Sequence, residues 1–335
     1  MKVLFITRLY HPHVGGIEKH IEKISARLIK KSYEIAVLTT KHEKHLINKE
    51  SVNKVRIVRF PQPNIKYLGI LITWFYMIKN IRLFTQSDII HIHDVFIWYW
   101  PIKILMPRKN VYLTIHGRWG EYPIPFKDIF QKRIAVRFTR GNICAGRYIP
   151  KHYGFKHSFI TYGGVDDFKS TNIKKNKKMI LYVGRLDKDI ELIKVIQIFK
   201  NLKGFEFEFC GDGDLKKECM KVGKVHGWVD PTNYYQKASF CIASGYLTIL
   251  EALSGKCLTF ALYGHALQKD YYLLSPFPKY IKISNKPELI KNNILRYSRD
   301  NLNMQKKVNE GYDWAVRQTW DRVADLYTDL WGIKY

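Results

Sequence analysis

Residues 240–261 read FCIASGYLTILEALSGKCLTFA, and this stretch decides the fold. The apolar run 240–243 predicts a buried strand, residues 248–254 predict a helix, and residues 257–261 predict a second strand. A strand, a helix and a strand joined by short turns form a βαβ unit, in which the two strands run parallel. The stretch therefore predicts a parallel sheet covered by helices.

The same alternation of apolar runs and amphipathic segments extends along the chain. Further strands are expected at residues 3–7, 34–39, 55–60, 89–93, 111–115, 142–145 and 159–162, and at 179–183, 205–210 and 224–226. Helices are expected at residues 17–30, 67–84, 190–201, 215–222 and 232–237. This pattern predicts an α/β protein with two Rossmann-like, doubly wound parallel-sheet domains, which bind ligands at the carboxyl ends of their strands.

One polar and strongly basic segment interrupts the alternation. Residues 171–178 read TNIKKNKK and have no apolar periodicity, so they are the best candidate for a linker. We expect a first domain over residues 1–168, a basic linker over 169–178 and a second domain over 179–311. The amphipathic and aromatic residues 312–335 are expected to form a helix that packs against the body of the protein.

Charge is the unusual part of the composition. The 335 residues include 56 Lys and Arg against 29 Asp and Glu, a net charge of +27, which attracts polyanions such as nucleoside diphosphates, nucleic acid or an anionic membrane. The five cysteines form no CxxC pair, which argues against a disulfide framework or a cysteine-based metal site. The first apolar run is too short for a signal peptide, and no run is long enough to span a bilayer. We therefore expect a cytoplasmic protein.

Two segments of the first half, residues 67–78 and 95–106, are unusually apolar and aromatic. The basic residues around them are Lys66, Lys79, Arg82, Lys103, Arg108 and Lys109. One interpretation is ordinary packing in the core of the first domain. The other is a basic, apolar surface that meets an anionic bilayer on the inner face of the cell membrane and presents a lipid-linked acceptor.

Several loops follow predicted strands and could carry chemistry. Gly15 and Gly16 open the first helix, where glycine lets the backbone approach a ligand and the helix N-terminus favours an anion. His116 ends the strand 111–115 and could contact a substrate hydroxyl, although a structural histidine is an equal interpretation. His91 and His93 share one face of their strand, where packing is a better interpretation than metal binding.

The second half offers phosphate-binding candidates. Arg185 follows the strand 179–183, and its planar guanidinium suits phosphate. The loop and helix at residues 244–252 place free first-turn amides before Glu251, whose carboxylate could accept hydrogen bonds from ribose hydroxyls or simply complement the helix dipole. The Gly-Asp-Gly-Asp of residues 211–214 contains the Asp-x-Asp pattern of some metal sites, but its glycines favour a tight turn into a helix.

In this order, the motifs resemble those of the family 4 retaining glycosyltransferases, which have the GT-B fold. The matching segments are VGGIE (14–18), SDIIHIH (87–93), TIHG (114–117), YGGVD (162–166), VGRL (183–186), GDG (211–213), GWV (227–229), LEA (250–252) and YDW (312–314). The resemblance implies two Rossmann-like domains facing a central cleft, with a C-terminal helix that crosses back to the first domain.

The resemblance also implies an activity and roles for residues. A UDP- or GDP-sugar would bind the second domain, and a glycan, lipid-linked or protein-linked acceptor would bind the first. The sugar would be transferred with retention of configuration, without a cofactor or metal ion. The catalytic residues would be His116 and Arg185. The donor-binding residues would be Gly16, Arg185, Lys188, Gly211, Tyr246, Leu247, Thr248 and Glu251. The acceptor-binding residues would be His93 and Gly15.

The sequence departs from the family pattern at three places. Ala243 stands eight positions before Glu251, where the family has the first glutamate of its E-x7-E motif. Ile190 stands where the family often has lysine, so that Lys188 would substitute for it, and Gly163 stands where asparagine is usual. Three alternatives stay open: a catalytically degenerate GT-B protein that binds a glycan or partner, a GT-B epimerase, and a basic nucleic-acid-binding protein. The last has the charge but no recognisable nucleic-acid-reading motif.

Overall fold

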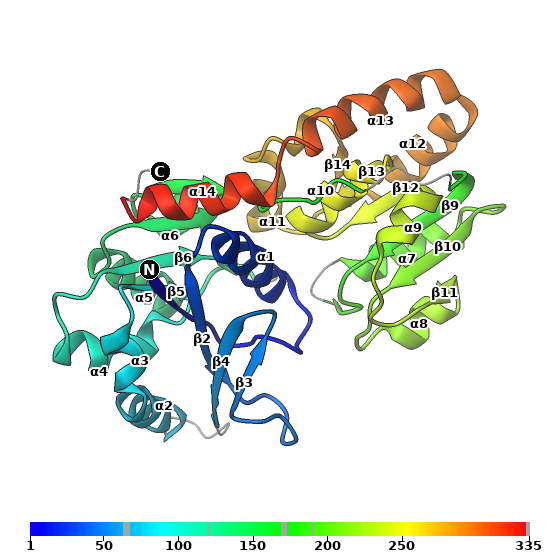
Figure 1. Cartoon of the computed structure of the whole chain (residues 1–335). Coiled ribbons are helices and arrows are strands. Elements are labelled where there is room, and N and C mark those ends of the chain that lie inside the picture. The colour runs from blue at the N-terminus through cyan, green and yellow to red at the C-terminus, as the bar shows by residue number, and fades with distance from the viewer. Residues whose placement is uncertain (63–67, 119–120, 169–172, 189–190, 333–335) are drawn as a thin grey trace. The chain divides into compact units, whose positions relative to one another are not determined.

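The computed structural model describes residues 1–62, 68–118, 121–168, 173–188 and 191–332. These residues form two compact units (Figure 1). Unit 1 comprises residues 1–118, 124–161 and 320–335, and unit 2 comprises residues 119–123 and 162–319.

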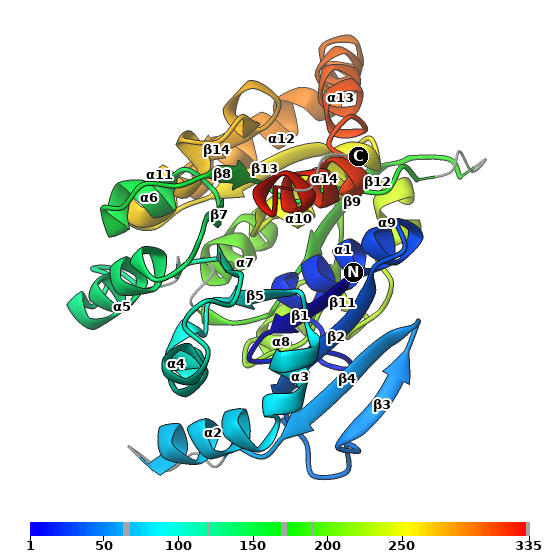
Figure 2. The same ribbon diagram turned by 60° about the vertical axis from the view of Figure 1, so that its left-hand side comes forward.

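Unit 1 is built on an eight-stranded sheet. Its strands are β1 (Lys2–Ile6), β2 (Glu34–Thr40), β3 (Lys49–Val52), β4 (Val55–Phe60), β5 (Ile89–His93), β6 (Val111–Ile115), β7 (Asn142–Ala145) and β8 (Phe159–Thr161). The order across the sheet is β3-β4-β2-β1-β5-β6-β7-β8, and only β3 pairs antiparallel to its neighbour (Figure 2). The direction of winding reverses between β1 and β5. This reversal is a topological switch point, where open α/β sheets bind their ligands.

The helices of unit 1 are α1 (Gly16–Lys30), α2 (Leu68–Lys79), α3 (Ile81–Gln86), α4 (Phe96–Leu105), α5 (Phe126–Arg137), α6 (Tyr148–Tyr153) and α14 (Trp320–Leu330). Helix α1 is amphipathic and buries Ile21, Ile24 and Leu28 at helical spacing. Helix α14 packs against α1, and Lys31 and Asp325 form an ion pair of 2.5 Å between them. The last helix of the chain therefore belongs to unit 1.

Unit 2 is built on a six-stranded, fully parallel sheet. Its strands are β9 (Asn176–Val183), β10 (Glu206–Cys210), β11 (Lys224–Val225), β12 (Ala238–Ala243), β13 (Leu258–Leu262) and β14 (Lys282–Ser284), in the order β11-β10-β9-β12-β13-β14. Its helices are α7 (Leu192–Lys200), α8 (Lys216–Met220), α9 (Thr232–Lys237), α10 (Tyr246–Ser254), α11 (Ala266–Leu273), α12 (Pro287–Arg299) and α13 (Asn301–Ala315). The winding reverses between β9 and β12, which is the switch point of this sheet.

The prediction of two doubly wound α/β sheets is confirmed, and the structure differs from it in detail. The helix expected over residues 67–84 is two helices, α2 and α3, which meet at Asn80. The expected C-terminal helix is also divided, because α13 ends at Ala315 and α14 begins at Trp320. Among the described residues, none of the helices combines the length and apolar character needed to cross a bilayer.

The expected linker over residues 169–178 is partly structured. Residues 169–172 lie outside the described part of the chain, but β9 already begins at Asn176. The ammonium group of Lys175 donates to the carbonyl oxygens of Tyr235, Ala238 and Gly255 at 2.5–2.9 Å. This lysine is therefore anchored in unit 2 and does not belong to a solvated linker.

Candidate functional site

Three loops meet at the carboxyl edge of the unit 2 sheet, because β10 and β12 both pair with β9. The amide of Gly184 donates to the carbonyl of Cys210 at 3.1 Å. A Cβ atom on Gly211 would lie 1.9 Å from the carbonyl oxygen of Gly184, and one on Gly184 would lie 2.7 Å from Ser244 Oγ. Only glycine permits this approach, so the loops after β9, β10 and β12 are fixed to one another at the switch point.

The Gly-Asp-Gly motif after β10 acts as a turn. The carbonyl of Asp212 accepts a hydrogen bond from the Leu186 amide at 2.9 Å, and its carboxylate contacts Lys216 Nζ at 2.8 Å. This hydrogen bond from Lys216 and one from the Gly213 amide lower the pKa of Asp212. Among the described residues, no group of three His, Cys, Asp or Glu side chains could hold a metal ion.

Arg185 lies at the rim of this edge, and its side chain is half-exposed. Its guanidinium forms an ion pair of 2.6 Å with Asp187, and its carbonyl accepts a hydrogen bond from the Tyr182 hydroxyl at 3.2 Å. Lys188 is exposed three residues further along the same loop, while position 190 lies outside the described residues. The guanidinium of Arg185 is thus already oriented. An incoming phosphate would compete with the Asp187 carboxylate for it.

Helix α10 begins at Tyr246, directly after the N-cap Gly245. The amide of Tyr246 donates to the hydroxyl of Tyr271 at 2.9 Å, and the two rings stack with their centroids 3.8 Å apart. The amides of Leu247 and Thr248 follow in the first turn, where the helix itself supplies no acceptor. A phosphate oxygen is a suitable acceptor at such a helix start.

Glu251 is buried one turn further along α10, and its side chain is held in place. Its Oε2 atom accepts a hydrogen bond of 3.2 Å from the hydroxyl of Tyr235 on α9. Burial, and then the charge of Glu251, raise the pKa of Tyr235 well above its usual value, so that its hydroxyl stays a donor. Ala243, at the position of the missing glutamate, is buried at the end of β12.

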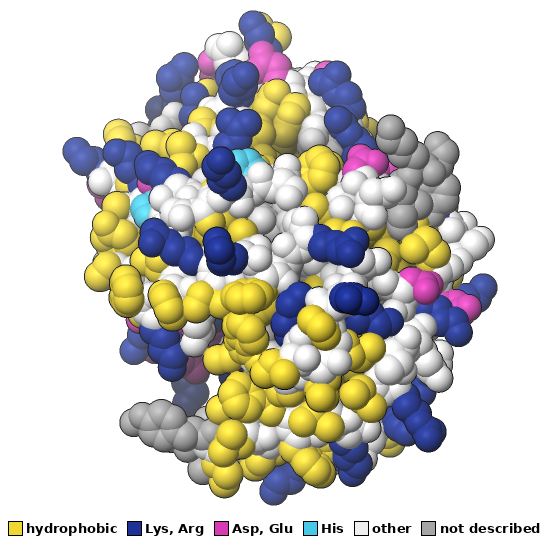
Figure 3. All heavy atoms as spheres, turned by 90° about the vertical axis from the view of Figure 1, so that its left-hand side faces the viewer, with side chains coloured by type: hydrophobic (Ala, Val, Ile, Leu, Met, Phe, Trp, Pro, Cys, Tyr) yellow, Lys and Arg dark blue, Asp and Glu magenta, His cyan; other side chains and the backbone are white. Residues whose placement is uncertain are grey.

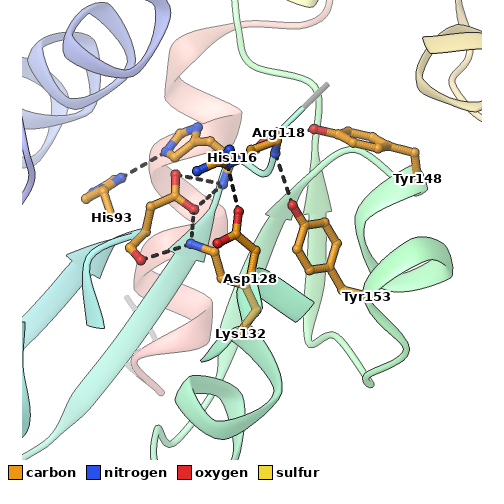
Figure 4. A network of polar contacts seen from close by, with 8 residues as sticks. His93, His116, Arg118, Asp128, Lys132, Tyr148 and Tyr153 are labelled. Atoms are coloured by element: carbon orange, nitrogen blue, oxygen red, sulfur yellow. Dashed lines mark hydrogen bonds and ion pairs between the residues drawn. The ribbon is translucent and has the colours of Figure 1, made fainter. Parts of the chain in front are cut away.

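In unit 1, histidines gather at the ends of β5 and β6. His93 Nδ1 and His116 Nε2 lie 3.1 Å apart, and the two rings stack (Figure 4). His91 Nε2 contacts Thr114 Oγ1 at 2.7 Å, and His20 from α1 packs its ring edge against His116. Burial lowers the pKa of all four imidazoles, so they are neutral at neutral pH. The sequence-predicted residues His93 and His116 therefore form one contact.

Asp94 and Lys132 complete this cluster, and neither was predicted from the sequence. The Asp94 carboxylate accepts the His116 amide at 3.2 Å and the Lys132 ammonium at 2.5 Å. Burial alone would raise the pKa of Asp94, but the charge of Lys132 and these hydrogen bonds hold it below its usual value. Asp94 directly follows β5 at the switch point, which is a signal that could have identified it.

A second ion pair lies beside this cluster, between Arg118 and Asp128 (Figure 4). Arg118 Nε and Asp128 Oδ2 are 2.7 Å apart, and the Arg118 amide donates to the hydroxyl of Tyr153 at 3.1 Å. The hydroxyl of Tyr148 donates to the carbonyl of His116 at 2.8 Å. The loop after β6 is therefore fixed on both sides of Gly117.

The two glycines after β1 start helix α1. Gly15 is its N-cap in an extended conformation, and a Cβ atom there would lie 2.3 Å from Glu18 Oε2. The same glutamate contacts His13 Nδ1 at 3.1 Å, and burial raises its pKa. Gly16 is exposed as the first residue of the helix. The structure thus brings Glu18 against the glycine loop.

Comparisons with known proteins agree with this architecture. Residues 14–166 match the model of the family described as Glycosyltransferase Family 4. An uncharacterized glycosyltransferase of Methanocaldococcus jannaschii is 26% identical over 232 residues, which cover 65% of this chain and 62% of that protein.

Solved structures share the fold at low identity. Sucrose-phosphate synthase from Thermosynechococcus elongatus superposes with a TM-score of 0.78 at 14% identity, over 99% of both chains. HepE from Anabaena, solved in complex with UDP, superposes with a TM-score of 0.75 at 13% identity, over 98% of this chain and 99% of that one. The chain therefore has the GT-B fold, and its residues 14–166 are similar to Glycosyltransferase Family 4.

Proposed function

We propose that the chain transfers a sugar from a UDP- or GDP-sugar to a hydroxyl of a glycan, a lipid-linked or a protein-linked acceptor, with retention of configuration and without a metal ion. One observation carries the proposal: the loops after β9, β10 and β12 converge at the switch point of unit 2. They bring together a guanidinium at Arg185, the start of helix α10 and the buried carboxylate of Glu251.

The chemistry of the donor explains why these groups belong together. The departing nucleoside diphosphate gains negative charge, which fixed cations and amide dipoles stabilise. Arg185 and the first-turn amides of Leu247 and Thr248 supply that stabilisation, and Glu251 accepts hydrogen bonds from the ribose hydroxyls. The Anabaena relative has been solved with UDP-glucose, which makes a uridine nucleotide the first donor to test.

The acceptor hydroxyl is assigned to unit 1, at the end of β5 and β6. His116 is neutral there, so it can donate to one oxygen or accept from one hydroxyl without a change of charge. His93 contacts its ring, and the Asp94–Lys132 pair fixes its backbone. Gly15 and Gly16 lie at the other side of the same switch point, after β1.

One observation favours a second candidate function. Ala243 supplies no carboxylate at the position where the family binds the donor sugar through a glutamate. Loss of this carboxylate is expected in a protein that binds a nucleotide-sugar but does not transfer the sugar. Such a protein would bind the donor through Arg185 and Glu251 and would not consume it.

The test separates binding from turnover. Calorimetric titration with UDP, GDP and their glucose or mannose conjugates is expected to give binding by one of these two nucleotides, and ADP is expected not to bind. That binding should be lost in Arg185→Gln and Glu251→Gln but kept in Lys203→Gln, an exposed position just before β10. Release of the nucleotide from its sugar conjugate would then indicate transferase chemistry. Binding without release would favour the second candidate, and no binding by any nucleotide would contradict the proposal.

A further inference from the structure

Helix α2 exposes an apolar stripe. Leu68, Leu71, Phe75 and Ile78 are 46–59% exposed, and their spacing of three or four residues places them on one side of the helix. The side chains that this helix buries include Thr73 and Met77. A helix on the surface of a soluble domain normally shows the opposite pattern, with its apolar stripe facing the core.

The apolar surface continues on two neighbouring helices. Ile104 and Leu105, at the end of α4, are 75% and 56% exposed. Phe126 and Phe130, on α5, are 77% and 53% exposed, and their rings stack on one another. Figure 3 shows the side of the molecule on which such hydrophobic side chains gather. The exposed apolar residues of α2, α4 and α5 are called the apolar face below.

The three helices are packed together, so the apolar face is part of one folded unit. The indole of Trp74 on α2 donates to the carbonyl of Ile97 on α4 at 2.8 Å. The ring of Trp100 on α4 packs edge-on against Phe138, the C-cap of α5, with the centroids 5.1 Å apart. These contacts hold α2, α4 and the end of α5 together.

The charge around the apolar face is strongly positive. Residues 68–118 and 124–140 of unit 1 contain eleven Lys and Arg, three Asp and no Glu. Eight of the basic side chains are exposed, namely Lys79, Arg82, Arg108, Arg118, Lys127, Arg133, Arg137 and Arg140. Each Asp already has a cationic or amide partner: Asp88 accepts the Lys2 amide, Asp94 binds Lys132 and Asp128 binds Arg118.

We propose that the apolar face of α2, α4 and α5 docks in the plane of an anionic lipid bilayer. A bilayer surface satisfies both features at once, because exposed Phe, Leu and Ile side chains enter the boundary between headgroups and acyl chains while Lys and Arg contact lipid phosphates. The helices lie along the surface and do not span it, in keeping with their length. This inference goes beyond the proposed function and does not depend on it.

The experiment is co-sedimentation of the full chain with vesicles of neutral phosphatidylcholine, and with vesicles that also hold about 30% phosphatidylglycerol. Two triple variants test the two features separately. Phe75→Gln, Phe126→Gln and Phe130→Gln remove apolar area from exposed positions, and Lys79→Glu, Arg82→Glu and Lys127→Glu reverse charge beside it. The matched control is Lys203→Glu, Lys217→Glu and Lys224→Glu, the same charge change at exposed positions of unit 2.

The expected result is binding to anionic vesicles in preference to neutral ones. Each test variant should lower the partition coefficient by about tenfold or more, while the control keeps most of the binding. No binding by the wild type, or equal binding by the wild type and both test variants, would overturn the proposal. The proposal would also be overturned if the chain did not bind vesicles and instead formed a dimer that the phenylalanine variant dissociates. The apolar face would then bind a second copy of the chain. Circular dichroism of the same variants shows whether a loss of vesicle binding is due to misfolding. Nucleotide titration shows separately whether the proposed function holds.

Discussion

Tyr235 is a positioning residue for Glu251. Its hydroxyl donates to Glu251 Oε2 at 3.2 Å inside unit 2, where both side chains are buried. Its ring also stacks near Phe168, with the centroids 6.0 Å apart. A buried carboxylate keeps one orientation only while its hydrogen-bond donors are in place. The hydroxyl and the ring therefore have separable roles, which a single substitution can divide.

Tyr235→Phe keeps the ring and removes the hydroxyl. If Glu251 accepts from ribose, the dissociation constant for UDP should rise by about three- to tenfold, the value of one hydrogen bond. The change for 2′-deoxy-UDP should be smaller, because that ligand lacks one of the hydroxyls. Calorimetric titration of both nucleotides checks the prediction. An equal loss for both would indicate a purely structural role for the hydroxyl.

The second prediction at this scale concerns Gly211. An alanine there would place its Cβ atom 1.9 Å from the carbonyl oxygen of Gly184, in a backbone conformation with φ of 157° that side chains rarely adopt. Gly211→Ala should lower the free energy of unfolding of unit 2 by about 2 kcal/mol or more, measured by urea denaturation. Gly245→Ala is the matched control at the same edge, because its Cβ atom would meet only Tyr271 Oη at 3.6 Å. A loss below about 1 kcal/mol in Gly211→Ala would contradict the prediction.

Helix α14 is attached to the rest of unit 1 by buried polar contacts. The hydroxyl of its Tyr327 contacts His20 Nε2 at 2.9 Å and Thr114 Oγ1 at 2.8 Å. The indole of Trp331, which follows the helix, donates to His91 Nδ1 at 3.1 Å. These contacts need neutral imidazoles, because the ring nitrogen of His91 must accept a hydrogen bond. The attachment of α14 is therefore sensitive to protonation.

This attachment predicts a loss of stability in acid. Burial lowers the pKa of His20, His91 and His93 in the folded state, so the unfolded state takes up protons first as the pH falls below about 6.5. The free energy of unfolding of unit 1 should be highest above that pH. It should then decrease by about 1.4 kcal/mol per pH unit for each of these histidines.

Urea denaturation between pH 8 and pH 5 measures this slope. His20→Gln should make it shallower, because one buried titrating group is removed while the amide can still bond to Tyr327. Asp94 also makes the folded state less stable in acid, but at lower pH. Its contribution to the free energy of unfolding is fully present above the pKa of an unfolded carboxyl group, and it is lost as the pH falls through the lower pKa of the folded state. A slope that is unchanged in His20→Gln would contradict the prediction.

Elements that are buried on both sides were the ones the sequence predicted best. All residues of β5 and β6 are buried, so their apolar runs are continuous and the expected bounds are confirmed. Strand β3 was missed, because its sequence KESV is polar and its turn to β4 uses Asn53 and Lys54 with positive φ in place of the usual glycine. The interpretation of residues 67–78 and 95–106 as core segments is only partly correct. Helices α2 and α4 bury some of their apolar side chains and expose others.

For the whole molecule, family motifs located the strand-end residues but could not give their partners. The sequence placed His93 and His116 at the ends of two strands. The two side chains contact each other because these strands, β5 and β6, are neighbours in the sheet. The Asp94–Lys132 contact joins residues on a loop and on α5, which no local pattern connects. Likewise, the contact between Tyr235 and Glu251 depends on how α9 packs beside α10.

Unit 1 is built from segments that are far apart in the sequence, and this affects the order in which the two units can fold during synthesis. Unit 1 needs residues 1–118, 124–161 and 320–335, whereas nearly all of unit 2 is the continuous stretch 162–319. On the ribosome, unit 2 can complete its sheet before α14 has been translated. Until then the imidazoles of His20 and His91 lack their Tyr327 and Trp331 partners. The amino-terminal unit should therefore be the last to mature, and a released chain that ends at residue 319 should hold unit 2 folded and unit 1 protease-sensitive.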